Sequence, residues 1–360
     1  MPEAKTDSYI MNGNPTGDVG NRLMTANWDV GALRPWLASN GRTYMTVLDK
    51  NGKTVNVEIS NANTSLRQYD WKQIDKAVVQ AAKPRLKAVD DLRSRGLTYV
   101  IPNGMSKTVL QTETETDIND AQITMDAIHK GPADRPQWEV TNLPLPIIHY
   151  DFHYSLRQIQ ASREGGSPLD TTTAAKAGRK VAEAAEKLLL GKWSPASYTY
   201  GGGTITGYTN FGDVMTQTIT SPATSGWTGQ TLLTELLAAR QQSKVAYHYG
   251  PWALYVGPTW GQYLDQDWST QKGSGNIRDR LAQTEGIESI KELDYLTTTE
   301  MLLVQMSSDV VRLVDGMDIT TVQWSTDGGM LLHFKTMAII VPQLRSDIND
   351  RTGIVYMSVA

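Results

Sequence analysis

Alternation of apolar and polar residues predicts strands near both ends of the chain. Thr43–Leu48 and Thr54–Ile59 flank an Asn51-Gly52 pair, which is typical of the tight turn of a β-hairpin. A second, longer hairpin is expected around Asp327-Gly328-Gly329. Its arms, and further short strands, are predicted over residues 147–152, 252–256, 301–305, 310–314, 319–324, 330–341 and 354–359.

A period of about 3.6 residues between apolar positions predicts the helices. Residues 70–95 carry a stripe that begins at Trp71, with Pro84 expected to split the helix and Gly96 to end it. Residues 167–191 form an Ala-rich helix whose small residues permit close approach of a sheet or another helix. Shorter helices are predicted over 228–242 and from Asn276 onward. With few parallel crossovers, these elements predict an α+β fold.

Residues 97–143 are polar and alternate in two places. Thr108–Thr116 and Ala121–Ala127 are each expected to form a strand, with Asp117–Asp120 as the turn between them. A ribbon of two strands is marginally stable alone, so we expect it to lie on a neighbouring subunit. The polar residues 1–65 are also too few to build a core, and the same expectation applies to them.

Composition excludes several functional classes. The chain has 360 residues, no cysteine and a net charge of −4, so disulfides, cysteine–metal sites and thiol catalysis are ruled out. The charge balance gives no basic excess for wrapping nucleic acid. The first residues lack the apolar core of a signal peptide, and no apolar run reaches membrane-spanning length.

The familiar phosphate-binding motifs are incomplete. Gly52-Lys53-Thr54 could end a phosphate-binding loop, but Val47 stands where the loop needs its first glycine. Gly201-Gly202-Gly203 lacks the third glycine of a dinucleotide fingerprint and opens no helix. We therefore predict no cofactor.

The candidate catalytic and metal-binding side chains also favour a plain interpretation. His149 and His153 lie on a predicted strand, which would hold them roughly 13 Å apart, so packing is favoured over a shared metal. Glu113 and Glu115 lie on the predicted ribbon with no helper nearby, which favours a solvated face over paired catalytic acids. The sequence thus predicts neither a catalytic residue nor a metal site.

One stretch is specific enough to suggest a family. It runs from the Pro-rich strand Leu143–Phe152 through Ser155-Leu156-Arg157 and Ala161-Ser162-Arg163 to Gly165–Thr171, and then into the Ala-rich helix that ends at Leu190-Gly191. This order resembles the major capsid proteins of tailed phages with the Hong Kong 97-type fold, particularly the branch related to encapsulin shells. The resemblance extends over about residues 66–360 and is specific over 143–191.

The resemblance implies a capsid fold with an N-terminal arm, an extended β-ribbon loop, a peripheral domain with a long spine helix, and an axial domain. We assign the arm with its hairpin to residues 1–65, a helix of the peripheral region to 66–96, the extended loop to 97–142, the peripheral domain to 143–222 and 315–360, and the axial domain to 223–314.

The same resemblance implies a structural subunit, not an enzyme. It would self-assemble through pentamers and hexamers into an icosahedral phage capsid around double-stranded DNA, in the host bacterial cytoplasm and with no membrane. Scaffolding, portal and decoration proteins would be further partners, and packaged DNA would make only weak, non-specific contacts. Candidate assembly contacts are Trp71, Met125, Trp138 and Arg157, with a plain core role equally open for Trp71.

Two other functions remain open. An encapsulin-like nanocompartment shell would bind cargo proteins on its inner face, although the long polar arm argues against it. A carbohydrate-active enzyme or binding module would need a pocket with convergent carboxylates and aromatic side chains. No such cluster is evident in the sequence.

Overall fold

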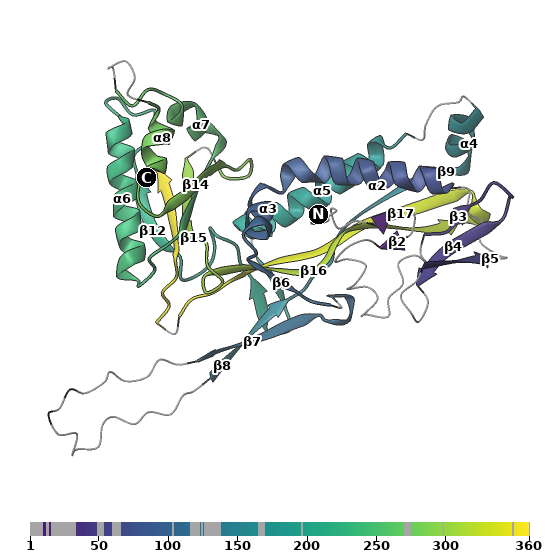
Figure 1. Ribbon diagram of the computed structural model, residues 1–360, viewed down its shortest axis with the longest axis horizontal. Helices are drawn as coiled ribbons and strands as arrows, with labels where there is room; N and C mark the ends of the chain where they lie inside the picture. The colour runs from purple at the N-terminus through teal and green to yellow at the C-terminus, as the bar shows by residue number, and fades with distance from the viewer. Residues whose placement is uncertain are drawn as a thin grey trace, which may run out of the picture. The chain divides into compact units, whose positions relative to one another are not determined.

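The computed structural model divides the chain into two compact units (Figure 1). Unit 1 comprises residues 1–108, 145–193 and 313–342, and unit 2 comprises residues 109–144, 194–312 and 343–360. Within these ranges the structure describes residues 10–11, 14–15, 34–48, 54–59, 66–102, 104–115, 123, 125, 138–164, 170–195, 197–269, 275–297, 299–347 and 349–359.

The first long helix of unit 1 is split as the sequence predicts. Helix α2 (Gln68–Ala82) leads through a 3-10 turn, η2 (Lys83–Arg85), into α3 (Lys87–Ser94). The split falls at Pro84, which cannot donate the hydrogen bond that a continuous helix needs. Helix α2 begins two residues earlier than expected, because the backbone N–H of Arg67 donates to the Asp70 carboxylate at 2.8 Å and closes the first turn.

The Ala-rich helix is α5 (Thr172–Leu190), which packs beside α2 (Figure 1). The two helices approach so closely at Gly178 that a Cβ there would lie 2.7 Å from the Val78 carbonyl oxygen. The helix ends as predicted at Gly191, whose φ of 75° is left-handed. It begins at Thr172, whose N–H donates to the Asp170 carboxylate, and the predicted start at residue 167 lies outside the described residues. The shorter α4 (Leu156–Glu164) precedes it.

A four-stranded sheet lies under these helices, in the order β6-β16-β17-β9. Its strands are β6 (Thr98–Val100), β9 (Ile148–Ser155), β16 (Val311–Thr326) and β17 (Leu331–Leu344). The predicted long hairpin is confirmed, with the short turn η4 (Asp327–Gly329) at its bend. Its first arm is longer than expected, because the two strands predicted over 310–314 and 319–324 form one continuous strand that begins at Val311. Phe152 and Phe334 stack between the sheet and the helices at 5.1 Å, together with buried Trp71.

The arm contains the predicted hairpin. Strands β4 (Thr43–Leu48) and β5 (Thr54–Ile59) pair antiparallel, with Met45 opposite Val57, and β3 (Trp36–Leu37) adds a third strand. The turn at Asn51-Gly52 lies outside the described residues. Strands β1 (Ile10–Met11) and β2 (Asn14–Pro15) form a further short pair, and the turn η3 (Gly104–Ser106) follows β6.

Unit 2 is built on a five-stranded sheet in the order β12-β18-β15-β13-β14. One face of the sheet packs against three helices through a core that includes Trp252 and Trp260. The predicted strands and helices in this region are all present. The elements are β12 (Met215–Ile219), α6 (Gly229–Val245), β13 (Trp252–Val256), α7 (Pro258–Leu264), α8 (Ile277–Ala282), β14 (Ile287–Glu292), β15 (Glu300–Gln305) and β18 (Ile354–Val359).

Two separate pairs of strands complete unit 2. Strand β7 (Val109–Glu115) pairs antiparallel with β8 (Trp138–Pro144), and β10 (Tyr198–Tyr200) pairs with β11 (Gly203–Ile205). The predicted pairing of Thr108–Thr116 with Ala121–Ala127 is therefore wrong. Alternation identifies a strand that has one buried face, but it does not specify which segment supplies the hydrogen-bond partner.

Candidate assembly surfaces

The ribbon formed by β7 and β8 exposes one face. Trp138 and Val140 lie on this face and are 60% and 55% exposed. In the antiparallel register Trp138 stands opposite Glu115 and Val140 opposite Glu113, and Glu113 is exposed. Such contiguous exposed apolar groups are typical of a protein–protein contact.

The opposite face of the ribbon contacts the rest of unit 2. Leu110 and Leu143 stand across from each other and are both buried. Beside them the hydroxyls of Thr112 and Thr141 lie 2.9 Å apart, and the Gln343 side-chain amide donates to the Thr112 hydroxyl at 3.2 Å. The base of the ribbon is thus held in place while its exposed face is left free.

The predicted contact residue Met125 lies farther along the same excursion of the chain. It and Ile123 are the two described residues between β7 and β8, and both side chains are fully exposed. The predicted turn at Asp117–Asp120 lies outside the described residues. Sequence analysis did not single out Ile123 or Val140 as contacts, although both occupy apolar positions in alternating segments.

The other two predicted contact residues belong to unit 1. Trp71 is fully buried and packs edge-on against Phe334, with ring centroids 5.9 Å apart, so it is a core residue. Arg157 is exposed on α4, immediately after β9.

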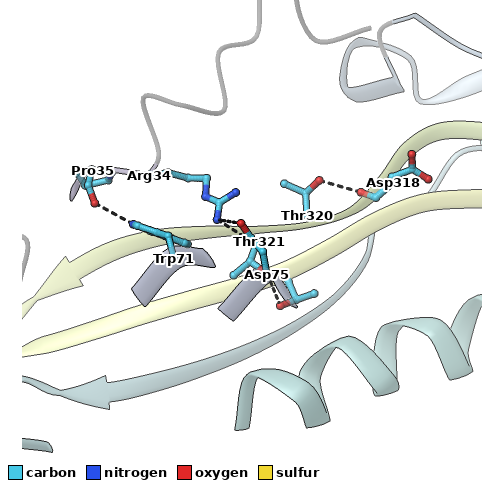
Figure 2. A network of polar contacts seen from close by, with 8 residues as sticks. Arg34, Pro35, Trp71, Asp75, Asp318, Thr320 and Thr321 are labelled. Carbon is cyan, nitrogen blue, oxygen red and sulfur yellow. Dashed lines mark hydrogen bonds and ion pairs between the residues drawn. The ribbon is translucent and has the colours of Figure 1, made fainter. Parts of the chain in front are cut away.

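Trp71 also belongs to a buried polar network that ties the arm to α2 (Figure 2). The Arg34 guanidinium donates to both carboxylate oxygens of Asp75 at 2.7 Å and lies 4.2 Å from the centre of the Trp71 ring. The Trp71 indole N–H donates to the Pro35 carbonyl at 3.1 Å. Arg34 is completely buried, so the ion pair is shielded from water.

Two effects act on the pKa of Asp75 in opposite directions. Burial raises the pKa of Asp75 to about 6, while the charge and hydrogen bonds of Arg34 act in the other direction. Sequence analysis missed this anchor. The available signal was the position of Asp75 within the apolar stripe of Trp71, Ile74 and Val78, where a charged side chain requires a buried partner.

A second buried carboxylate links helix α5 to the first turn of helix α3. Glu186 on α5 accepts hydrogen bonds from the backbone N–H groups of Ala88 and Val89, at 2.7 and 3.2 Å. These amides lie in the first turn of α3, where a carboxylate is favoured by the unpaired N–H groups. Burial nevertheless raises the pKa of Glu186 to about 7.

The side chains considered for chemistry do not converge. Glu113 is exposed on the ribbon, and His153 stands opposite His333 with ring centroids 5.8 Å apart. His149 lies beside Asp151, with 3.5 Å between ring nitrogen and carboxylate. Within the described ranges, no group of three or more His, Asp or Glu residues is arranged to hold a metal ion. No described helix combines the length and apolar character needed to cross a membrane.

We compared the chain with known proteins, protein families and solved structures. No curated protein matches the chain. A family model described as a family of unknown function, DUF6260, matches residues 61–357. That span is most of the chain.

Solved structures resemble the chain in fold, with low sequence identity. The virus-like particle from Pyrococcus furiosus is 13% identical, with a TM-score of 0.55 over 80% of this chain and 99% of that one. The capsid of Myoviridae phage XM1 is 9% identical, with a TM-score of 0.57 over 74% and 91% of the two chains. A structure from Mycobacterium phage Bobi is 13% identical, with a TM-score of 0.53 over 79% and 90%. The chain therefore has the Hong Kong 97-type capsid fold and belongs to the DUF6260 family.

Proposed function

We propose that the chain is a structural subunit that self-assembles into an icosahedral phage capsid around double-stranded DNA. The observation that carries this proposal is the exposed apolar face of the β7–β8 ribbon on a chain with a capsid fold. A folded subunit that exposes Trp138 and Val140 lowers its free energy when another copy covers them.

The size of this contribution supports an obligate contact. Burying a large apolar side chain stabilises a complex by roughly 2 kcal/mol, and an aromatic anchor often dominates an interface. Trp138, Val140, Ile123 and Met125 supply four such groups on one excursion of the chain. The neighbouring Glu113 would then favour a basic group on the partner.

The domain assignment is part of the proposal. Unit 1, with its spine helix α5, corresponds to the arm and the peripheral domain, and the ribbon of unit 2 corresponds to the extended loop. The sheet of unit 2 corresponds to the axial domain near the five-fold and six-fold axes. Strands β12 and β18 pair within that sheet, which supports moving residues 194–222 and 343–360 from the peripheral to the axial domain.

A second function has one observation in its favour. The virus-like particle of Pyrococcus furiosus is covered over 99% of its length by this chain. An encapsulin-like shell would enclose cargo proteins and not DNA. For the phage capsid, the proposal also includes assembly in the host cytoplasm. It further includes scaffolding, portal and decoration proteins as partners.

Light scattering and negative-stain imaging of the purified full-length chain test the proposal. Closed shells are expected, with nuclease-protected double-stranded DNA in particles from infected cells. Shells that contain a defined protein cargo in place of DNA would favour the nanocompartment. A chain that stays monomeric, alone and with a scaffolding protein, would overturn both.

A pair of matched variants tests the ribbon itself. Trp138→Ala should impair shell formation and leave the subunit folded, because its side chain is exposed before assembly. Trp193→Ala, which removes a 38% exposed tryptophan from unit 1, is the control and should assemble normally. Equal assembly of the two variants would argue against the ribbon as the contact.

A further inference from the structure

Helix α6 presents an uncharged stripe to solvent. Its exposed residues recur three or four positions apart, which places them on one face of the helix. The face of a surface helix that looks away from the core usually carries charged residues. Here its exposed members are Gln230, Thr234, Leu237, Ala238, Gln241 and Val245.

The charged residues of α6 face elsewhere. Glu235 accepts hydrogen bonds from the backbone N–H and the hydroxyl of Thr220, at 2.9 and 2.6 Å. Arg240 donates to the Glu285 carbonyl at 2.9 Å. Lys244, three residues from Gln241, is half-buried at the border of the stripe. Two of the three charges are thus directed onto unit 2 itself.

The stripe continues past the end of α6 into an aromatic tip, which we define as Tyr247 and Tyr249. Their side chains are 68% and 65% exposed, and Val245 beside them is 68% exposed. The Arg351 guanidinium lies 4.9 Å from the Tyr247 ring and is itself paired with Asp347 at 2.8 Å. Tyrosine with little net charge is the composition favoured at the centre of protein interfaces.

The backbone holds Tyr247 in an unfavourable conformation. Its φ is 64°, in the left-handed region where a bulky residue costs about 1 kcal/mol and glycine is usual. The N–H of His248 donates to the Ser243 carbonyl and the N–H of Tyr247 to the Lys244 carbonyl, which closes the helix in the way a glycine normally does. A tyrosine here projects its ring outward at a cost to local stability.

We infer that the uncharged stripe and the aromatic tip pack against the same surface of other copies of this chain around a rotation axis. The inference rests on the proposed function, which supplies the many copies. Residues close to a rotation axis meet their own symmetry mates, so any charge there would face a like charge. The exposed members of the stripe carry no charge, and the guanidinium beside the tip is already paired with Asp347, so the surface satisfies this condition. A surface that binds a different protein has no such restriction.

A charge of either sign, introduced into the stripe, distinguishes packing against other copies of this chain from binding of a different protein. Gln241→Lys and Gln241→Glu should each raise the protein concentration needed for shell assembly by about tenfold, and an equimolar mixture of the two should restore it. The same two changes at Gln283, an exposed glutamine of unit 2 outside the stripe, serve as controls. Tolerance of one sign at Gln241 would indicate a different partner, and tolerance of both would indicate no contact. Either result would overturn the inference.

Single cysteines provide an independent test, because the chain has none of its own. After mild oxidation of assembled shells, Gln241→Cys or Tyr249→Cys should give disulfide-linked dimers, and Gln283→Cys should not. If shells form but neither the stripe cysteine nor the tip cysteine gives a crosslink, this inference is overturned and the proposed function stays intact. Failure of the unmodified chain to assemble would overturn the two together.

Discussion

Glu186 makes the stability of unit 1 depend on pH in a direction opposite to that of most carboxylates. Its pKa is raised by burial from an ordinary value of 4.5 to about 7. Between these values the folded chain retains a proton that the unfolded chain has released. The contribution of Glu186 to the free energy of unfolding should therefore be greatest below about pH 4.5 and should be lost as the pH rises through about 7.

The magnitude follows from the difference between the two pKa values. Each pH unit corresponds to about 1.4 kcal/mol, so the change from 4.5 to about 7 is worth about 3 kcal/mol. Glu186→Gln is neutral at every pH and should remove this dependence. It also leaves one of the N–H groups of Ala88 and Val89 without its acceptor, which costs about 1–3 kcal/mol at all pH values.

The assay is urea unfolding of the unassembled subunit at several pH values from about pH 5 to about pH 8. Tryptophan fluorescence monitors the unfolding. The expected result is that the stability of Glu186→Gln, relative to the unmodified chain, rises by about 2.5 kcal/mol across this range, because at pH 5 the unfolded chain has already released most of its proton. Comparing the two chains cancels the pH dependence of Asp75, which both share. Glu285→Gln, on the exposed surface of unit 2, controls for the loss of a charge. A constant difference between the two chains would refute the reasoning.

Three further predictions concern packing in unit 1. Asp75→Asn should lower the free energy of unfolding by about 3–5 kcal/mol because it leaves Arg34 charged and buried, whereas Arg34→Met with Asp75→Leu should cost less, as measured by urea titration. Gly178→Val should separate α2 from α5 and lower the thermal unfolding temperature by several degrees, with Gly178→Ala milder. Gly191→Ala, at a left-handed helix end, should cost about 1 kcal/mol in the same urea assay, and no effect would contradict the observed φ.

Sequence patterns predicted the elements that depend on local chemistry. The split at Pro84, the helix end at Gly191 and the strand pairing around Asn51-Gly52 each follow from the backbone preferences of one or two residues. The apolar face of α5 was also predictable, because burial against one partner imposes a helical period.

Other features depend on contacts between distant segments, which periodicity does not encode. Strand β7 alternates as expected, but its partner β8 lies beyond another alternating segment. Strand β18 joins the sheet of unit 2 through hydrogen bonds with β12 and β15, and nothing local to residues 354–359 specifies that pairing. Asp75 and Glu186 stand within apolar stripes, so sequence could signal their burial but could not identify Arg34 or the α3 amides as their partners.

The position of β18 within its sheet has a consequence for biosynthesis. This strand is inserted between β12 and β15, so those two strands remain without part of their hydrogen bonding until residues 354–359 have been translated. The β16–β17 hairpin is likewise central to the sheet of unit 1 and comes late in the chain. A nascent polypeptide therefore cannot complete the sheet of unit 1 before β17 (residues 331–344), or that of unit 2 before β18 (residues 354–359), has been translated. If the chain is a shell subunit as proposed, it would become competent to associate only after that point. Such a delay would keep half-made chains out of a growing shell.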